Sequence, residues 1–505
     1  MRAQRSENFN AHGGTLFRII SYAVVFLLCV VILAKARSRP LRRTALLIAS
    51  YALYLTWGAG FAAVLVTSTV MNYLVGEWLR RNRSAVTLSI GIFLNLALLS
   101  TFKYLPEAAV HLPFSSLLLQ RFAHLALPLG ISFWTFQAMS YLFDVYQGDD
   151  VEPSFFEFAL YMVFFPVTIS GPICRMSEML PQFRSDSVTR SDDIARGFRR
   201  IATGVLMMQL AKLLGQGILG GDGVASGFDH AANWSGPDVW CLAFGYGLQL
   251  FFDFAGYSHI AIGAAQALGF MIPENFARPF ASTTPSIFWT RWHMSLSFWI
   301  RDYVFFPLMR MRREAWWRNL SLLIAMVLFG LWHRASILFL LWGAFHGLLL
   351  LLHRQVEGME RRFDWTPPRI PWTALAWVST ISLVNLGWIF FRANSLGQAH
   401  QMLAAILSPA SYRSHFLSAS LYWLVLLLAV GYTIVLLAID SLNRASPETV
   451  DAEAPPSNLP PGQMALLARW RWFWLPPLYV LALIFVLIGT LSGGTSTAQM
   501  MYGNF

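Results

Sequence analysis

A succession of long apolar segments constrains this chain more than any other feature of its sequence. A helix needs roughly 20 apolar residues to cross a hydrocarbon core of about 30 Å, and runs of that length recur along most of the chain. Only 12% of the 505 residues are charged and 56% are hydrophobic, which leaves too little polar surface to cover a water-soluble globule. The sequence therefore predicts an all-α integral membrane protein with multiple passes.

The apolar runs predict roughly ten to thirteen membrane-embedded helices, some of them re-entrant. The segment 44–75 is too long for one straight helix and short for two, and 239–270 is either two short helices or one bent helix. The proline-rich stretch 440–462 predicts a solvated loop. The predicted spans are Leu16–Ala34, Thr44–Val75, Ala85–Phe102, Leu125–Val145, Phe155–Ile173, Ile194–Leu214, Val239–Phe270, Ile287–Leu308, Asn319–Trp332, Ser336–Leu352, Trp372–Phe391, Phe416–Ile439 and Trp472–Leu491.

The net charge of +11 comes largely from short basic clusters between the apolar runs. Such clusters lie at 35–43, 80–83 and 310–318, as the positive-inside rule expects of cytoplasmic loops that meet anionic headgroups. The cluster after the first apolar run is stronger than the one before it, so the N-terminus of that helix is expected outside. Because the basic residues flank membrane spans, we expect membrane lipid, and not nucleic acid, as a partner.

Several enzyme classes lack their motifs in this sequence. It contains no GxSxG, no Walker-type loop and no HExxH, which argues against a serine hydrolase, an ATP-driven pump and a zinc protease. The three cysteines, Cys29, Cys174 and Cys241, are widely spaced in or beside apolar runs. We interpret them as small buried side chains, and no metal site is expected.

The stretch Ser286–Tyr303 carries aromatic and charged residues in separate helical stripes. Three- and four-residue steps separate the members of one largely aromatic stripe: Trp289, Trp292, Leu296, Trp299 and Tyr303. Arg291 and Asp302 share a different stripe, and His293 lies on a third. One amphipathic helix of this kind suits a shallow or re-entrant position near the headgroups. The alternative interpretation is an interfacial anchor with structural Arg–Asp contacts.

Two histidines flank the next apolar run. His333 ends one run, which places it near a membrane face, and His346 lies well inside the following run. They cannot pair directly unless the helix breaks at 334–336, because 13 residues of continuous helix span about 20 Å. A deep imidazole is costly unless it faces a partner or a cavity, and a neutral one can act as a general base. The alternative is a structural histidine that donates to a backbone carbonyl.

Other ionisable residues allow weaker inferences. Asp253 lies inside an apolar run, where a carboxylate can orient a histidine or bind a substrate, or can pair with an arginine to stabilise the fold. Asp144 lies near a predicted helix end and is interpreted as solvated, and Lys103 flanks an apolar run, where snorkelling is the default expectation.

Six segments follow one another in a fixed order over most of the chain. They are Leu127–Gly148 (LPLGISFWTFQAMSYLFDVYQG), Phe164–Arg175 (FFPVTISGPICR), Phe252–Phe276 (FDFAGYSHIAIGAAQALGFMIPENF), Phe288–Pro307 (FWTRWHMSLSFWIRDYVFFP), Gly330–Gly347 (GLWHRASILFLLWGAFHG) and Leu386–Ala393 (LGWIFFRA). In these segments the chain resembles the membrane-bound O-acyltransferase (MBOAT) superfamily, and within it the inner-membrane subunits of bacterial alginate O-acetyltransferases. The resemblance runs from Asn72 to Ala393.

The resemblance implies a ring-like bundle of helices around a central funnel. It divides the chain into N-terminal helices at 1–71, a catalytic core at 72–393 and C-terminal helices at 394–505. By resemblance, His346 takes the place of the family's essential histidine, and His333 is a second catalytic residue. The residues expected to line the funnel and to position the substrate or the re-entrant helix are His293, Arg291, Asp302, Trp332 and Asp253.

Three departures from the family pattern bear on the substrates. Arg334 stands where the family has Gly, and His259 stands where it often has Asp. The segment Met309–Arg313 replaces a frequent Gly-Gly-Asn-Arg motif. These changes affect the mouth of the expected funnel and leave the identities of acyl donor and acceptor open.

The resemblance implies O-acetylation of an extracytoplasmic polysaccharide, such as alginate, cellulose or peptidoglycan, by a protein of the bacterial inner membrane. Acetyl-CoA is the implied donor, with no bound cofactor, and a periplasmic or membrane-tethered acetyltransferase is the implied partner. Three alternatives stay open: D-alanyl transfer to teichoic acid, a transporter or flippase of an acyl or lipid-linked intermediate, and an assembly subunit.

Overall fold

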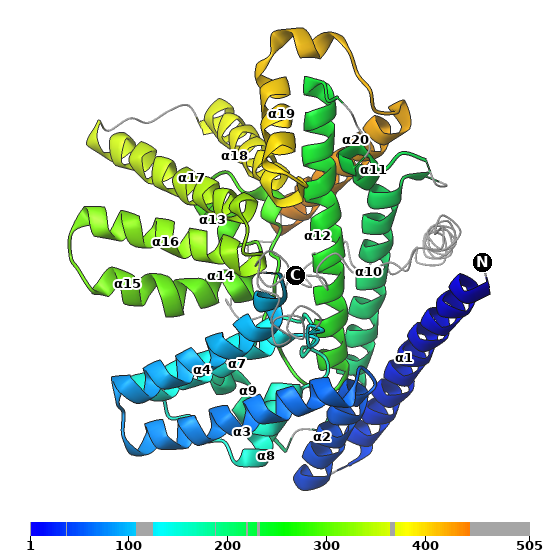
Figure 1. Ribbon diagram of the computed structural model, residues 1–505, viewed down its shortest axis with the longest axis vertical. Helices are drawn as coiled ribbons and strands as arrows, with labels where there is room; N and C mark the ends of the chain where they lie inside the picture. Colours follow the sequence, from blue (N-terminus) through cyan, green and yellow to red (C-terminus); the bar gives the residue numbers. More distant parts are fainter. Residues whose placement is uncertain are drawn as a thin grey trace, which may run out of the picture.

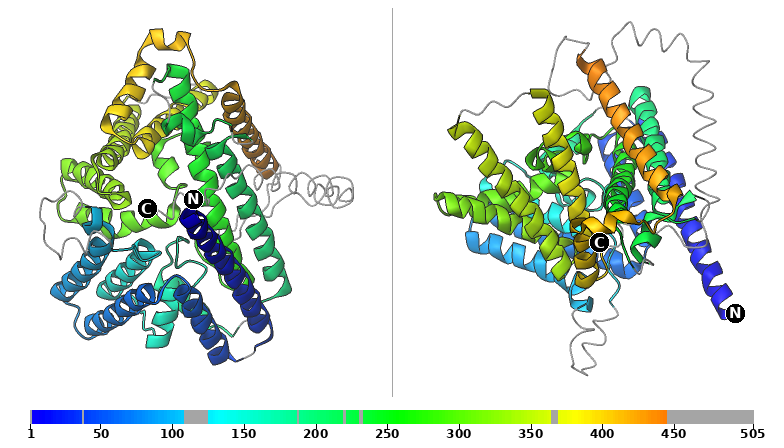
Figure 2. Two further views of the ribbon diagram at one scale, coloured as in Figure 1. Left: turned by 45° about the vertical axis from the view of Figure 1, so that its right-hand side comes forward. Right: turned by 90° about the horizontal axis from the view of Figure 1, so that it is seen from above.

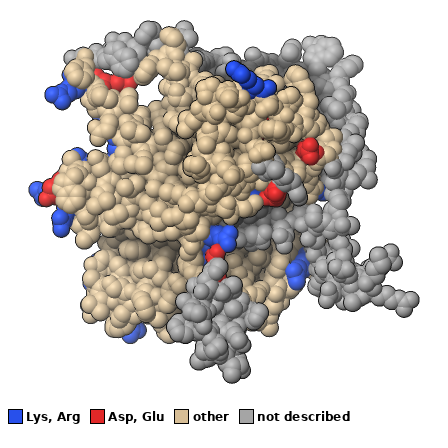
Figure 3. Space-filling view, turned by 45° about the horizontal axis from the view of Figure 1, so that its top comes forward, with Lys and Arg blue, Asp and Glu red and all other residues tan. Residues whose placement is uncertain are grey.

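The computed structural model describes residues 2–36, 38–107, 125–186, 188–218, 221–229, 233–363 and 369–444, and this part of the chain is helical without β-strands. Six of its helices are long and apolar enough to cross a membrane: Ala59–Arg81, Ala85–Lys103, Gly236–Ala267, Ala315–His333, Ile337–Arg362 and Pro371–Arg392. Large apolar side chains such as Phe93 and Leu427 lie on the exterior, and the face in Figure 3 is broadly uncharged. The prediction of an all-α, multi-pass membrane protein is confirmed.

The helices are arranged around a central region where several of their ends meet (Figure 1), and α1 projects beyond the other helices when the molecule is seen from above (Figure 2). The long helices are α1 (Arg2–Lys35), α2 (Arg39–Leu55), α3 (Ala59–Arg81), α4 (Ala85–Lys103), α7 (Ile131–Gln147), α10 (Ser191–Gln216), α12 (Gly236–Ala267), α16 (Ala315–His333), α17 (Ile337–Arg362), α18 (Arg369–Arg392) and α20 (Ala419–Arg444). The shorter ones are α8 (Phe155–Val163), α9 (Met176–Arg184), α11 (Val224–Asp229), η2 (Pro279–Ala281), α13 (Pro285–Trp289), α14 (Met294–Ile300), the π-helix η3 (Arg301–Phe305), α15 (Phe306–Arg310), α19 (Leu396–Leu407) and η4 (Pro409–Arg413).

The two ambiguous apolar segments are now resolved. The segment 44–75 belongs to two helices, α2 and α3, separated by a short turn at Thr56–Gly58. The segment 239–270 is one continuous helix, α12. The expected helix at 155–173 is helical only as far as Val163. The expected span at 472–491 and most of the expected loop at 440–462 lie outside the described residues, and the proposed boundary after residue 71 falls within α3.

Helices α10 and α12 pack against each other in antiparallel directions through glycines. A Cβ atom added at Gly197 would lie 2.5 Å from the carbonyl oxygen of Gly263, and one added at Gly204 would lie 2.4 Å from that of Gly256. No side chain fits at these positions without moving the helices apart, because backbone atoms cannot give way as a flexible side chain can. The glycines therefore set the close approach of the two helices.

We expect Gly204→Leu to destabilise the protein, because overpacking of a tight contact typically costs about 1–3 kcal/mol. Thermal unfolding of the purified protein in detergent measures the effect. The matched control is Gly60→Leu at the start of α3, where an added Cβ has no neighbour within 4 Å. Equal unfolding temperatures for the two variants would contradict this account of the packing.

One side of the helical bundle carries most of the basic clusters. Lys103 at the end of α4 donates to the carbonyl oxygen of Trp332 near the end of α16, so these two helices end on the same side of the bundle. Their starts follow the clusters at 80–83 and 310–313, and α17, antiparallel to α16, returns to the same side to end at Arg361 and Arg362. We call this side, where α4 and α16 begin, the basic side.

The segment 268–310 enters the helical bundle from the basic side and leaves it on the same side. After α12 ends, the backbone carbonyls of Phe280 and Thr283 accept hydrogen bonds from Trp377 and Thr380 in the first half of α18, which itself begins where α17 has returned to the basic side. The segment then runs through α13, α14, η3 and α15 to the basic loop before α16. It does not cross to the opposite side, in agreement with the expected re-entrant position.

The prediction of one continuous helix through Ser286–Tyr303 is wrong. The chain breaks at His293, whose φ of 43° lies in the left-handed region. Tertiary hydrogen bonds fix this break: Met294 N donates to the carbonyl oxygen of Asn275 at 2.9 Å, and the hydroxyl of Ser295 donates to the side-chain oxygen of Asn275 at 2.6 Å. Pairing with the chain that follows α12 therefore overrides the helical periodicity of the sequence.

Candidate active site

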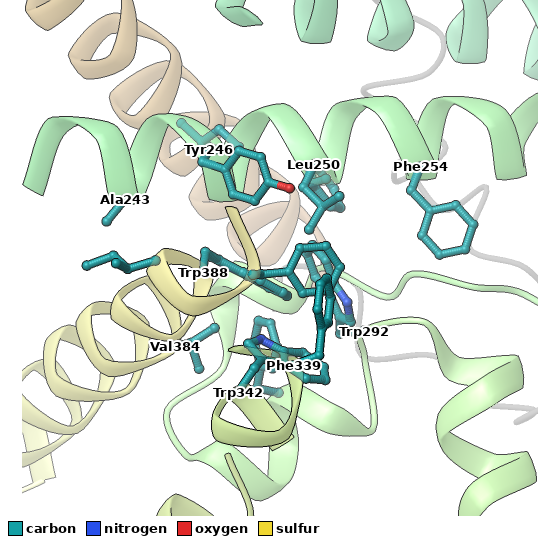
Figure 4. Packing of buried hydrophobic residues seen from close by; sticks show 14 of the residues in the cluster. Ala243, Tyr246, Leu250, Phe254, Trp292, Phe339, Trp342, Val384 and Trp388 are labelled. Carbon is teal, nitrogen blue, oxygen red and sulfur yellow. The ribbon is translucent and has the colours of Figure 1, made fainter. Parts of the chain in front are cut away.

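His346 lies on α17 inside a shell of aromatic rings. Its side chain is only 1% exposed, and its ring centroid lies 5.0 Å from that of Trp342, 5.1 Å from Trp289 and 6.0 Å from Trp388. Figure 4 shows Trp342, Trp388 and Trp292 gathered below α12. The expectation of a deeply placed imidazole agrees with this burial, whereas the funnel around it stays a prediction.

Neither ring nitrogen of His346 has a hydrogen-bond partner among the described residues. A structural histidine would donate to a backbone carbonyl, and this contact is not made in the described part of the chain. An unpaired buried polar group typically costs about 1–3 kcal/mol. The position is therefore more readily explained by a bound substrate or water that supplies the missing partner.

Glycines bring the neighbouring helices close to this histidine. A Cβ atom added at Gly387 of α18 would lie 2.5 Å from Nε2 of His346 and 3.0 Å from its Cε1. On α17 itself, a Cβ atom at Gly343 would lie 2.3 Å from the carbonyl oxygen of Met326 in α16. The glycines on both helices thus allow α16, α17 and α18 to hold the imidazole tightly between them.

His333 lies at the end of α16 and approaches the same tryptophan as His346. The helix breaks at 334–336, since α16 ends at His333 and α17 begins at Ile337. The ring of Trp342 lies 5.6 Å from His333 and 5.0 Å from His346, centroid to centroid. Trp342 therefore joins the two histidines in one aromatic cluster, and His333 is 3% exposed.

The end of α4 contacts the turn between α16 and α17. Lys103 Nζ donates to the carbonyl oxygen of Trp332 and lies 4.8 Å from the centroid of its indole ring. On the exposed side of the turn, Arg334 forms an ion pair with Glu107 at 2.6 Å. The sequence suggested only a snorkelling Lys103, whereas the structure places its ammonium group beside the Trp332–His333 pair.

The other expected site residues are distributed over two regions. His293 is fully buried, with its ring 4.5 Å from that of Phe254 on α12, and Asp253 is half-buried on the same helix. Arg291 is half-buried and its backbone carbonyl accepts from Ala277 N at 3.0 Å.

Asp302 belongs to a different cluster from the histidines. It forms ion pairs with Arg175 and Arg301, which are structural Arg–Asp contacts of the kind that the interfacial-anchor interpretation expected. The structure thus brings His333, His346 and Trp332 together around Trp342, while Asp302 connects the re-entrant segment to the chain before α9.

Sequence reasoning missed a set of indole N–H groups around the histidines. The Nε1 atoms of Trp289, Trp332, Trp342 and Trp388 are buried and have no hydrogen-bond partner among the described residues. Donors of this kind can stabilise negative charge that develops on a carbonyl oxygen during acyl transfer. Only Trp289 belongs to the aromatic stripe that the sequence shows; Trp332, Trp342 and Trp388 come from α16, α17 and α18, and only the fold brings the four together.

A base and several N–H donors in a water-poor environment are groups that acyl transfer can use. In the part of the chain that the structure describes, no group of three or more His, Cys, Asp or Glu side chains is arranged to hold a metal ion. Within the aromatic cluster, the ring nitrogens of His346 are groups that can accept a proton.

Comparisons with known proteins agree with this chemistry. Residues 17–394 match the model of the MBOAT, membrane-bound O-acyltransferase, family. A probable alginate O-acetylase, AlgI, of Azotobacter vinelandii is 35% identical over 380 residues, which cover 73% of each chain. The peptidoglycan O-acetyltransferase of Helicobacter pylori is 32% identical over 425 residues, 77% of this chain and 78% of that protein.

A teichoic acid D-alanyltransferase of Bacillus subtilis is 29% identical over 295 residues, covering 54% of this chain and 70% of that protein. The match to the family model extends over well more than half of the sequence, from the first apolar helix to the end of α18. Together with the all-α membrane fold, it establishes that this chain is an acyltransferase of the membrane-bound O-acyltransferase family.

Proposed function

We propose that this acyltransferase moves acetyl groups for O-acetylation of an extracytoplasmic polysaccharide and that His346 is its general base. One observation carries the proposal: a fully enclosed imidazole whose two nitrogens have no partner among the described residues, on a chain similar to polysaccharide O-acetyltransferases. An alginate-like polymer, cellulose or peptidoglycan is the final acceptor. The bacterial inner membrane is the location that this role requires.

The proposed reaction balances without any further reagent. His346 accepts the proton of an acceptor hydroxyl while the hydroxyl oxygen forms a bond to the carbonyl carbon of an acetyl thioester. The C–S bond then breaks, and the leaving thiolate takes the proton back from the imidazolium. The rings of Trp289, Trp342 and Trp388 surround His346, and their indole N–H groups, unpaired in the described part of the chain, are the donors that would act on the carbonyl oxygen as it gains charge.

The charge distribution supports a direction for the transfer. Basic loops favour the cytoplasm, so the basic side, with the clusters at 80–83 and 310–313, faces the cytoplasm in our proposal. Acetyl-CoA then reaches His346 from that side. His333 and the turn at 334–336 face the opposite side, where a membrane-tethered or periplasmic acetyltransferase would accept the acetyl group and pass it to the polymer.

Deletion of the gene followed by complementation tests the proposal. Ester-bound acetate, released from envelope polysaccharide by mild alkali, is expected to fall to background in the deletion strain and to return with the wild-type chain. Ester-bound D-alanine, measured in the same extracts, is expected to stay constant. Loss of D-alanine with unchanged acetate would instead assign the chain to teichoic acid modification, and no change in either would contradict both functions.

A further inference from the structure

Asp144 is a buried carboxylate that the proposed chemistry does not use. It lies in the last turn of α7 and is 6% exposed, although the sequence suggested a solvated residue. Its Oδ1 accepts a hydrogen bond of 2.6 Å from the hydroxyl of Tyr303 in η3. Its Oδ2 is buried and has no hydrogen-bond partner among the described residues.

An ion pair covers the Asp144–Tyr303 contact toward the surface. Arg175 forms an ion pair with Asp302, and its guanidinium carbon lies 5.2 Å from the centroid of the Tyr303 ring. Arg301 Nε donates to Asp302 as well, at 2.7 Å. The side chains of Arg175 and Asp302 are 29% and 19% exposed, whereas Tyr303 is 5% exposed. These contacts form a chain of polar side chains from the surface to Asp144, which we call the polar path.

The backbone at this place is unusual. Residues 301–305 form a π-helix between α14 and α15, a rare conformation that is frequent at functional sites. It carries both Tyr303, which contacts Asp144, and Asp302, which contacts Arg175. The same short element thus positions both layers of the polar path.

A purely structural role does not explain Asp144. The nearby cation, Arg175, is paired with Asp302 instead, and a buried carboxylate oxygen without a donor costs more than the roughly 1–3 kcal/mol of a neutral group. A bound molecule with an N–H or O–H group would remove this cost. Asp144 lies one turn from Gln147, the end of α7, beside Gly148, which contacts Arg83 of the basic cluster at 80–83.

We propose that Asp144, fixed by Tyr303, is a binding residue for the acyl donor and that its Oδ2 accepts a hydrogen bond from an amide N–H or hydroxyl of the donor's chain. The pantetheine arm of coenzyme A carries such groups between its nucleotide and its thiol. The arm would reach Asp144 from the basic side, where the end of α7 lies beside Arg83. The inference rests on the proposed function, because it takes the donor to be a coenzyme A thioester.

Binding of coenzyme A to the purified full-length protein, measured by calorimetry, tests the inference. In Asp144→Asn an amide replaces the carboxylate with little change in size. Either the amide NH2 group, a hydrogen-bond donor, or the neutral amide oxygen, a weaker acceptor, then occupies the position of Oδ2. We expect coenzyme A to bind at least about 10-fold more weakly, a difference of about 1.4 kcal/mol. The KM for acetyl-CoA is expected to rise by a similar factor, with kcat changed less than about 3-fold.

Two further variants make the test decisive. Asp186→Asn is the matched control, because it makes the same chemical change in a carboxylate whose side chain is 65% exposed and paired with Arg39, and it is expected to leave coenzyme A binding unchanged. Tyr303→Phe retains Asp144 but removes the hydroxyl that fixes it, and is expected to weaken binding several-fold. If Asp144→Asn does not fold, this variant decides the question.

The outcomes separate this inference from the proposed function. Wild-type affinity and KM in a folded Asp144→Asn, or wild-type affinity in Tyr303→Phe when the first variant is unfolded, would overturn the inference and leave the role of His346 untouched. Absence of any coenzyme A binding to the wild-type protein would overturn the proposed donor itself. His346→Ala is expected to bind coenzyme A normally while its rate of acetyl transfer falls by about 10²–10⁴-fold.

Discussion

Replacement of His346 with alanine is expected to lower the rate of acetyl transfer by about 10²–10⁴-fold, the usual contribution of a general base. The His346 imidazole contacts Trp289, Trp342 and Trp388 and can accept a proton. Without it, the acceptor hydroxyl must attack while it still holds its proton. The measurement is the initial rate of acetyl transfer from labelled acetyl-CoA by the purified protein in lipid vesicles.

The matched control for this variant is His353→Ala. His353 lies two turns further along α17, with its Nε2 3.2 Å from Oε1 of Glu357, so the same truncation is made on the same helix away from the cluster. We expect wild-type rates per folded molecule in the control. A wild-type rate per molecule in His346→Ala would refute the general-base role, and reduced abundance with a normal rate per molecule would favour an assembly subunit.

Gly387→Ala is expected to reduce acetyl transfer by about 10–100-fold without adding or removing any reactive group. The new methyl group would lie 2.5 Å from Nε2 of His346, so the imidazole must shift or turn. A displacement of about 1 Å in a catalytic group can cost on the order of 10²-fold in rate. The same vesicle assay measures the effect, and thermal unfolding reports how much of it arises from lost stability.

Gly431→Ala on α20 makes the same change where an added Cβ has no neighbour within 4 Å. It is expected to retain both activity and stability. If Gly387→Ala lowers the unfolding temperature strongly, and the lost free energy of unfolding equals the free energy that corresponds to the loss of rate, the glycine serves only the packing of α18. Unchanged activity would mean that the position of the His346 ring is not critical.

Much of the fold could be predicted from hydropathy alone. The apolar runs located the long helices because the length of a spanning helix is set by the thickness of the membrane. The same reasoning placed His346 deep in the protein, where the structure finds it 1% exposed. The break at 334–336 was foreseen only as a condition for bringing His333 and His346 together, and it is present.

The missed features depend on contacts between distant parts of the chain. The break at His293 is fixed by Asn275, which precedes it by 18 residues and belongs to the chain after α12. The burial of Asp144 depends on Tyr303, 159 residues away in sequence. Helical periodicity describes one helix at a time, so it cannot show which polar side chains two elements will bring together.

The course of residues 268–310 has a consequence for mapping this protein in cells. Because that segment returns to the side it came from, the loop before α12 and the turn at 334–336 lie in the same compartment. Reporter enzymes inserted at these two places should both be active or both be silent. Counting 287–308 as a full crossing would assign them to opposite compartments and would invert the orientation of every later helix.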